Sequence, residues 1–211
     1  MNAIIRRLAP LMTALVMGLG SAASQASEMT QLTLTIDPSL TYLHTYNDMR
    51  AGSATVIDLL AAGLHEGDLL LLERFGSFSY HGTGGTDDVA TGMAGVFSST
   101  NTLLDATNLN RVTGAIDAGT DVTTSVSYYG GYASNIAEDF SISSTWIRIP
   151  TGARFLFVAA TDSYWGDNTD PNGDFKVRIT AVPEPTESAL FAAGLVALGA
   201  TGWRRRRSGS K

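Results

Sequence analysis

Short stretches of alternating hydrophobic and polar residues recur along the middle of this chain, and that region has no capped helical pattern. Leu32, Leu34 and Ile36 alternate with polar residues until Asp37-Pro38 ends the run. Such alternation is typical of a strand with one buried face. Seven more ranges have strand character: residues 55–61, 68–75, 92–98, 121–128, 140–149, 154–160 and 175–181. This pattern predicts an all-β fold, an antiparallel β-sandwich or jelly roll.

Two of these ranges contain unbroken hydrophobic runs, at residues 69–72 and 155–158. A strand covered on both faces has this composition, so we expect both runs to form central strands. Residues 49–64 are the one range that can hold a short helix. We interpret Trp146, Tyr128 and Tyr129 as core or rim aromatics rather than as a ligand platform.

Composition excludes several kinds of chemistry. The 211 residues include no cysteine, which rules out disulfides, thiolate nucleophiles and Cys-ligated metals. Residues 27–182 hold 18 acidic and seven basic residues, a formal charge of −11. Such a body repels phosphate backbones and attracts cations, so we expect no nucleic-acid binding.

The N-terminus has the pattern of a secretory signal peptide. Arg6 and Arg7 precede a hydrophobic run over residues 8–20, and Ser24 and Ala26 suit the −3 and −1 positions of a cleavage site. We therefore expect residues 1–26 to be removed, with cleavage after Ala23 as the alternative. The other interpretation of this run is a buried N-terminal helix.

The C-terminus has three parts in a fixed order. Val182-Pro183-Glu184-Pro185 is followed by an uncharged stretch over residues 188–203, and then by the cluster Arg204, Arg205, Arg206 and Arg207. A helix over the uncharged stretch would reach about 24 Å, short for a bilayer core of about 30 Å unless the flanking residues snorkel. The arginines would hold this end in the cytoplasm, which leaves the body outside the inner membrane.

This order of motifs over residues 182–211 resembles the PEP-CTERM sorting signal, which exosortases of Gram-negative bacteria recognise and cut. The resemblance implies export by the Sec machinery and transient anchoring in the inner membrane by a transmembrane helix over residues 188–203. It also implies delivery to the cell surface or the extracellular matrix. A simple C-terminal membrane anchor is the alternative. Residues 27–181 then form the β-sandwich domain.

Residues 162–174 form the densest constellation of polar ligands in the body. They include four carboxylates and two amides: Asp162, Asp167, Asn168, Asp170, Asn172 and Asp174. Calcium takes about six to eight hard oxygen ligands, and this loop has no imidazole or thiolate for a softer metal. The loop therefore predicts a calcium site. The alternative is a solvated turn whose side chains cap their own backbone.

The stretches "LLAAGLHEGDLLLLERFGSFSY", "MAGVFSS", "IPTGARFLFVAATDSYWGDN" and "GDFKVRI" are together similar to the calcium-dependent galactophilic lectins of the PA-I type. This resemblance implies a metal held by the carbonyl of Tyr80 and the side chains of Asp162, Asp167 and Asn168. Asp170, Asn172 and Asp174 are candidate additional metal ligands. In those lectins the ion itself coordinates sugar hydroxyls. This chain lacks a counterpart of their His-Pro-Asp-Gln stretch, which grips the sugar.

The loop after Tyr80 contributes further candidates. His81 is placed to touch a ligand, as is Trp165, although a lone loop histidine is more often only solvated. Asp87 and Asp88 are candidates for a separate cation site, and substitution of Asp88 is not expected to affect the calcium loop. Neighbouring residues on an extended chain point apart, so this pair is a poor acid/base couple.

Enzyme motifs are missing from the sequence. There is no Gly-x-Ser-x-Gly elbow and no His-Glu-x-x-His. We therefore expect no enzyme but a secreted protein that uses a calcium-bearing loop to bind carbohydrate such as exopolysaccharide, in a biofilm or matrix. A structural matrix component whose acidic loop only stabilises the fold is the alternative, and a secreted glycan hydrolase is third.

Overall fold

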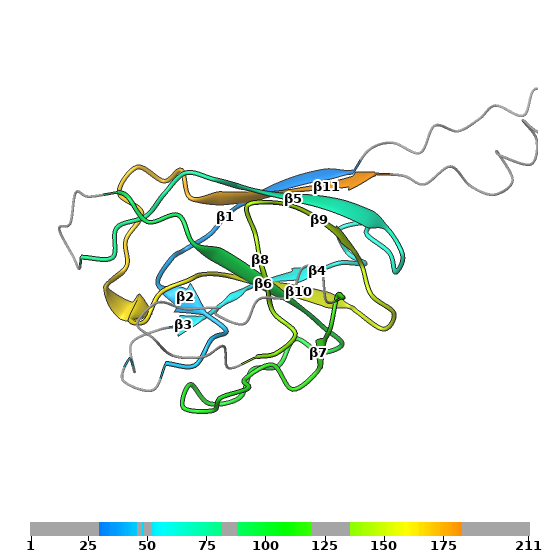
Figure 1. Ribbon diagram of the computed structural model, residues 1–211, viewed down its shortest axis with the longest axis horizontal. Coiled ribbons are helices and arrows are strands. Elements are labelled where there is room, and N and C mark those ends of the chain that lie inside the picture. The colour runs from blue at the N-terminus through cyan, green and yellow to red at the C-terminus, as the bar shows by residue number, and fades with distance from the viewer. Residues whose placement is uncertain (1–29, 46–47, 49–51, 82–87, 120–135, 183–211) are drawn as a thin grey trace, which may run out of the picture.

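The computed structural model describes residues 30–45, 48, 52–81, 88–119 and 136–182, which form two antiparallel sheets packed as a β-sandwich (Figure 1). The predicted signal peptide, Pro183 to Pro185, the predicted membrane helix and the arginine cluster all lie outside the described residues, as does the expected strand over residues 121–128. Within the described part of the chain, no helix has the length and hydrophobicity needed to cross a membrane.

One layer is a four-stranded sheet of order β1-β11-β5-β9. Its strands are β1 (Gln31–Thr35), β5 (Leu69–Phe75), β9 (Ser144–Arg148) and β11 (Lys176–Val182). The inward positions of β1, β11 and β5 align through the pairs Leu32–Ile179 and Ile179–Leu72. This register puts one hydrophobic face toward the other layer, as the alternating sequence requires.

The second layer is a five-stranded sheet of order β4-β10-β6-β7, in which β8 also pairs with β6. Its strands are β4 (Thr55–Asp58), β6 (Met93–Ser98), β7 (Ala115–Ile116), β8 (Phe140–Ser141) and β10 (Phe155–Ala160). All six residues of β6 and the last five of β10 are buried. The prediction that residues 155–158 form a central strand is therefore confirmed.

Residues 69–72 behave differently from this expectation. They form part of an inner strand of their sheet, but only Leu70 and Leu72 are buried, while Leu69 and Leu71 remain partly exposed. The strand is therefore covered on one face only, because within the described residues no further layer packs on the outer side of this sheet.

The expected strand over residues 140–149 is broken into β8 and β9, which belong to different sheets. The amide of Ile142 still donates to Met93 O in the five-stranded sheet, whereas Ser143 O accepts from Arg74 N in the other layer. Thr145 Oγ1 donates to Ser141 O across the bend. The serine- and threonine-rich sequence thus carries the chain from one sheet to the other.

Residues 52–64 contain no helix, so the short helix considered for residues 49–64 is not found in the described part of that range. They form β3 (Gly52–Ser53), β4 and a turn. β3 pairs in parallel with β2 (Leu40–Thr41), a second strand that lies outside the eight predicted ranges. These two-residue strands are too short to produce a recognisable alternation.

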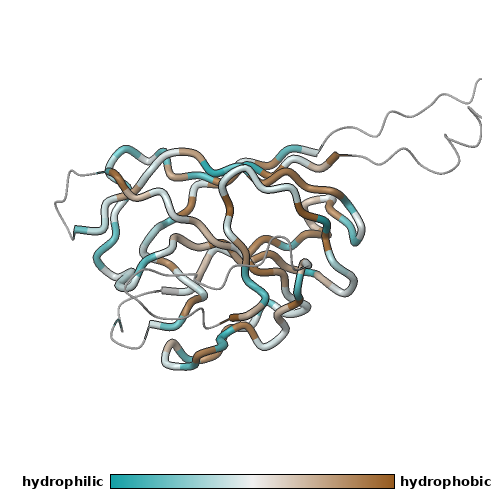
Figure 2. The backbone as a smooth tube through the Cα atoms, viewed as in Figure 1, coloured by the Kyte–Doolittle hydropathy of each residue, from teal (hydrophilic) through white to brown (hydrophobic). Residues whose placement is uncertain are grey.

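The hydrophobic core lies between the two sheets. Many hydrophobic stretches run along the strands of both layers (Figure 2). The largest fully buried side chains include Tyr42, Phe97, Phe140 and Phe157. Rings of Phe97 and Phe140 lie 5.4 Å apart between centroids, a normal separation for packed aromatics.

The two ends of the sandwich differ in what they carry. β11 ends at Val182, which pairs with Leu69 at the start of β5, and β1 begins beside it (Figure 1). β5 then runs away to Phe75, opposite Lys176. The loops that follow β5 and precede β11 therefore lie at the end of the sheet opposite Val182.

Replacing a core residue of β10 should test the packing. Leu156→Ala removes a fully buried side chain, so we expect the free energy of unfolding to fall by about 2–5 kcal/mol. Leu109→Ala is the matched control, because Leu109 is 67% exposed and its loss should change stability by less than about 0.5 kcal/mol. Urea denaturation of both variants measures the difference. Equal effects would contradict the layer assignment.

Candidate functional site

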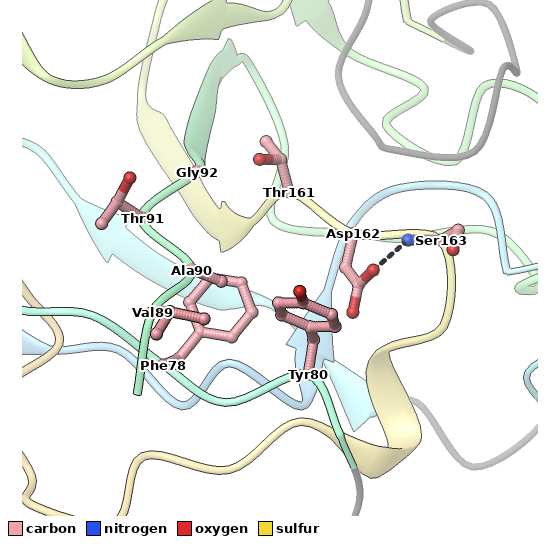
Figure 3. Close-up of a pocket in the computed structure, with 9 residues that line it drawn as sticks. All are labelled: Phe78, Tyr80, Val89, Ala90, Thr91, Gly92, Thr161, Asp162 and Ser163. Atoms are coloured by element: carbon pink, nitrogen blue, oxygen red, sulfur yellow. Dashed lines mark hydrogen bonds between the residues drawn. The ribbon is translucent and has the colours of Figure 1, made fainter. Parts of the chain in front are cut away.

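A pocket of about 620 Å³ opens at the end of the sandwich away from Val182. Three short segments line it: the one that follows β5, the one that enters β6 and the one that leaves β10 (Figure 3). The lining residues are Phe78, Tyr80, Val89, Ala90, Thr91, Gly92, Thr161, Asp162 and Ser163.

Backbone pairing holds these segments together. Phe78 and Ala90 exchange backbone hydrogen bonds of 2.8 and 2.9 Å, and Thr161 N donates to Gly92 O at 3.0 Å. A Cβ atom on Gly92 would collide with Thr161 Oγ1, so any larger residue there would displace the Thr161 hydroxyl. The pocket wall therefore continues the ladder in which Met93 pairs with Ala160.

Tyr80 and Asp162 form the most polar part of the pocket. Figure 3 shows the Tyr80 ring beside the carboxylate of Asp162, and the Ser163 amide donates to Asp162 Oδ1 at 2.6 Å. Tyr80 is 44% exposed, and its ring contacts that of His81 at a centroid distance of 4.1 Å. An exposed aromatic face and a carboxylate thus point into one cavity.

Partial burial raises the pKa of Asp162 above its ordinary value. Hydrogen bonds from the Ser163 amide and the Asn168 side chain oppose this rise, and the nearby charge of Asp167 adds to it. The ionised carboxylate is therefore unfavourable here unless a positive charge or a ligand donor compensates it.

Asn168 lies beneath this carboxylate. It is only 5% exposed, and its Nδ2 donates to Pro38 O at 3.1 Å. Its Oδ1 is buried, and no hydrogen-bond donor reaches it within the described residues. The structure thus brings Tyr80, Asp162, Asp167 and Asn168, the four residues expected from the lectin resemblance, into one neighbourhood.

The other acidic residues of the loop gather elsewhere. Asp170 and Asp174 meet Asp88, and one carboxylate oxygen of each lies within 4.8 Å of the others. Asn172 Nδ2 donates to Asp88 Oδ2. Asp88 Oδ1 is buried and receives no hydrogen bond from the described part of the chain. This three-Asp acidic cluster could bind a metal ion such as calcium.

Asp88 was expected to belong to a cation site separate from the 162–174 loop, whereas the structure brings its carboxylate to Asp170 and Asp174 of that loop. Ser77 joins the segments, since its Oγ donates to Asp88 O at 2.9 Å and its amide donates to Asp174 Oδ1 at 3.2 Å. The sequence hides this contact because 81 positions separate Asp88 from Asp170 along the chain. The one feature of the sequence that hints at this contact is the position of Asp88, directly before a short segment with strand character.

The turn at residues 170–174 is also braced by its own side chains. Asp170 Oδ1 accepts from the amides of Gly173 and Asp174, and its Oδ2 accepts from Phe175 N at 3.1 Å. Asn172 Oδ1 accepts from Asp174 N at 2.9 Å. These are the self-capping bonds expected for a solvated turn, so the acidic side chains shape the loop through hydrogen bonds to its own backbone.

Gly76 allows the turn to approach β5 closely. Its φ is +68°, and a Cβ atom there would collide with the backbone and carboxylate of Asp174. Ser79 and Thr169 exchange backbone hydrogen bonds of 2.8 and 2.9 Å just beyond it. The two loops expected to meet, residues 76–80 and 162–174, therefore lie side by side.

Two predicted ligand-binding residues have different outcomes. Trp165 starts the only helical turn in the described residues, the 3-10 helix Trp165–Asp167. It is 0% exposed, and its indole donates to Ala160 O at 2.9 Å. Its role is therefore corrected to a core residue with no surface to offer a ligand. His81 is exposed beside Tyr80 and remains a candidate.

Comparisons with known proteins give no relatives for this chain: no protein-family model, no curated protein and no solved structure matches it.

The raised pKa of Asp162 predicts that the free energy of unfolding depends on pH. The protonated form stabilises the folded state fully at pH values below the unfolded pKa, and this contribution is lost as pH rises through the folded pKa. Asp162→Asn cannot ionise and still accepts from Ser163 N. In chelator we therefore expect the variant to gain stability relative to the parent as pH rises from 3 to 7. Thermal unfolding across that range measures it, and a difference independent of pH would contradict the assignment.

Proposed function

We propose that this chain is an exported carbohydrate-binding protein whose pocket is stabilised by calcium. The observation that carries the proposal is the pairing of an exposed tyrosine ring with the Asp162 carboxylate in a pocket of about 620 Å³. The pocket adjoins the three-Asp cluster at two places along the chain. Asp88 of the cluster precedes Val89 of the pocket, and Ser77, which donates to Asp174 of the cluster, precedes Phe78 of the pocket.

The chemistry of the lining suits a sugar. A pyranose ring has an apolar face that packs on an aromatic ring and a rim of hydroxyls that need hydrogen-bond partners. Tyr80 offers the ring, while Asp162 and the hydroxyl-bearing residues Thr91, Thr161 and Ser163 line the same pocket. The volume is within the range of small-molecule sites, about 300–1,000 Å³. The proposed ligand is a mono- or disaccharide unit of a polysaccharide.

Calcium has a supporting role in this proposal. Asp88 directly precedes Val89, and Ser77 directly precedes Phe78, so an ion at Asp88, Asp170 and Asp174 would tie down two walls of the pocket. The lectin resemblance places the ion instead at Tyr80, Asp162, Asp167 and Asn168, in contact with the sugar. The buried Oδ1 of Asn168, which no donor among the described residues reaches, supports this second position.

Export rests on the sequence of the two ends. We propose that the Sec machinery exports the chain, that the helix over residues 188–203 holds it transiently in the inner membrane, and that an exosortase recognises the Val182-Pro183-Glu184-Pro185 motif. The protein then reaches the cell surface or matrix of a Gram-negative bacterium. Exopolysaccharide there is the proposed glycan, and neither nucleic acid binding nor catalysis is part of this role.

A structural matrix component is the second candidate. The backbone bonds accepted by Asp170 support it, because they brace the acidic turn with groups of the chain itself. Under this alternative the cluster stabilises the fold and the pocket binds nothing. Sugar binding separates the two.

Calcium should stabilise the folded chain through the three-Asp cluster. An ion at about a hundredfold excess over its Kd contributes about 2.7 kcal/mol, which corresponds to a rise in Tm of about 5–10 °C. Asp88→Asn should remove most of this rise, because the substitution takes away one ligand charge without removing a backbone hydrogen bond.

The control for this measurement is Asp117→Asn, at an exposed carboxylate far along the chain from the cluster. Differential scanning fluorimetry with calcium, magnesium and chelator provides the readout. If Asp162→Asn abolished the rise while Asp88→Asn left it intact, the ion would belong to the second position.

Tyr80 should be required for sugar binding. Tyr80→Ala removes the aromatic wall, so we expect binding on a glycan array with calcium to fall about tenfold or more, while Tyr80→Phe retains most of it. Because Tyr80 is 44% exposed and lies outside the core, its loss should change Tm much less than the loss of a core residue. A folded, calcium-loaded chain that binds no glycan would favour the structural alternative.

A further inference from the structure

The outward face of the four-stranded sheet carries side chains that the pocket and the core do not use. Cross-strand pairs place Leu71 opposite Trp146, Leu69 opposite Arg148, and Glu73 opposite Arg178. Paired residues project to the same side of a sheet, and their neighbours Leu70 and Leu72 are buried in the core. These residues therefore share the face turned away from the other layer.

An exposed aromatic strip lies on this face. Trp146 is 52% exposed although it stands in the middle of β9, beside the partly exposed Leu71. Phe75 is also exposed, with the Arg178 guanidinium 4.6 Å from the centre of its ring. The expectation that Trp146 is a core or rim residue misses this placement, since the ring contributes to an open sheet surface.

The charge on this face is opposite to that of the rest of the body. Its charged strand residues are Arg148, Lys176, Arg178 and Glu73, so it is net positive. They include three of the six basic residues in the described part of the chain, whereas residues 27–182 as a whole carry a formal charge of −11. Glu73 offsets one of these charges through an ion pair of 2.8 Å with Arg178, and Arg148 also donates to Gly67 O. A positive face on an acidic domain is complementary to an anionic partner.

Neutral polar groups complete the surface. Thr33 and Thr35 of β1 pair with Arg178 and Lys176, and Gln31 Nε2 donates to Thr180 Oγ1 at 3.3 Å. A row of hydroxyl and amide groups thus runs along β1, with Lys176 and Arg178 of β11 next to it, and with Phe75, Trp146 and Arg148 beyond β11.

We propose that this outward sheet face is a second binding surface, for an acidic polysaccharide, that works without calcium. The indole of Trp146 packs on the apolar face of a sugar ring, and Arg148, Lys176 and Arg178 pair with carboxylate groups along the polymer. Threonine and glutamine side chains of β1 hydrogen-bond to its hydroxyls. This surface is separate from the proposed pocket, so either can fail without the other.

Two other occupants fit the face less well. A bilayer would have to cover the polar row of Gln31, Thr33 and Thr35, which desolvation disfavours. A second copy of the chain would bring its own Arg148, Lys176 and Arg178 against these charges in a symmetric contact, which repulsion disfavours.

The test is affinity electrophoresis of the full chain in two gels. One gel contains alginate, which is a polyuronate, and the other contains dextran, which is a neutral polymer. Chelator is present throughout, which prevents alginate gelation and removes any calcium-dependent pocket. We expect alginate to retard the chain and dextran to have no effect. Trp146→Ala should weaken retardation about tenfold or more, and Lys176→Gln severalfold, while Trp146→Phe restores most of the binding. Salt at about 0.5 M should abolish most of the retardation by screening.

Tyr80→Ala is the matched control on the other site and should bind alginate like the parent chain. Circular dichroism and Tm establish that each variant is folded. In parallel, sedimentation measures the oligomeric state, and flotation with anionic vesicles measures membrane binding. The proposal is overturned by equal retardation in both polymers, by no retardation, or by binding that Trp146→Ala leaves unchanged. It is also overturned if Trp146→Ala instead dissociates a dimer or abolishes only vesicle binding.

Discussion

The burial of β10 on both faces is the constraint on which the rest of the structure depends. Its hydrophobic run lies between β4 and β6, so its only stable place is an inner position of a covered sheet. The register with β6 then fixes where each strand ends. Ala160 pairs with Met93, and the adjoining residues just beyond the two strands, Thr161 and Gly92, already line the pocket. The core thus determines the position of the pocket to within one residue.

The loops at this end are positioned by short polar contacts instead. Gly76 lets the backbone cross the acidic turn, Ser77 bonds to both Asp88 and Asp174, and Ser79 pairs with Thr169. Apart from the Ser77–Asp88 bond, which spans 11 positions, these contacts join segments far apart in the sequence. This division is common in β-sandwiches, where hydrophobic strands supply rigidity and loops supply chemistry.

Strand periodicity predicts the sandwich, because burial of alternate side chains leaves a direct trace in the sequence. The unbroken hydrophobic run at residues 155–158 predicts the inner position of β10. Periodicity could not predict the break between β8 and β9, since a strand that changes sheets keeps its alternation. It also could not show that the outer side of β5 is open, because Leu69 and Leu71 look the same in sequence as Leu70 and Leu72. Outward leucines differ from inward ones only through their neighbours in space.

The sequence predicts that the acidic loop gathers several carboxylates, but it does not predict that they separate into two groups. Its carboxylates separate into Asp162 and Asp167 near the pocket and Asp170 and Asp174 beside Asp88. Local composition gives the number of ligands available, whereas the direction in which each points depends on a turn whose bonds form only after folding. Trp165 illustrates the same limit, because burial of an aromatic in a loop depends on the space left by the core.

The placement of β11 has a mechanical consequence. This strand lies between β1 and β5, with five paired positions on one side and seven on the other, and it connects the pocket end to the end at Val182. A load applied between a ligand in the pocket and a tether beyond Val182 pulls along the strand axis. Hydrogen bonds perpendicular to that axis are then strained together in shear rather than opened one at a time. The sandwich is consequently oriented to resist a pull along β11, which is the direction of load if the proposed binding protein is held at its C-terminal end.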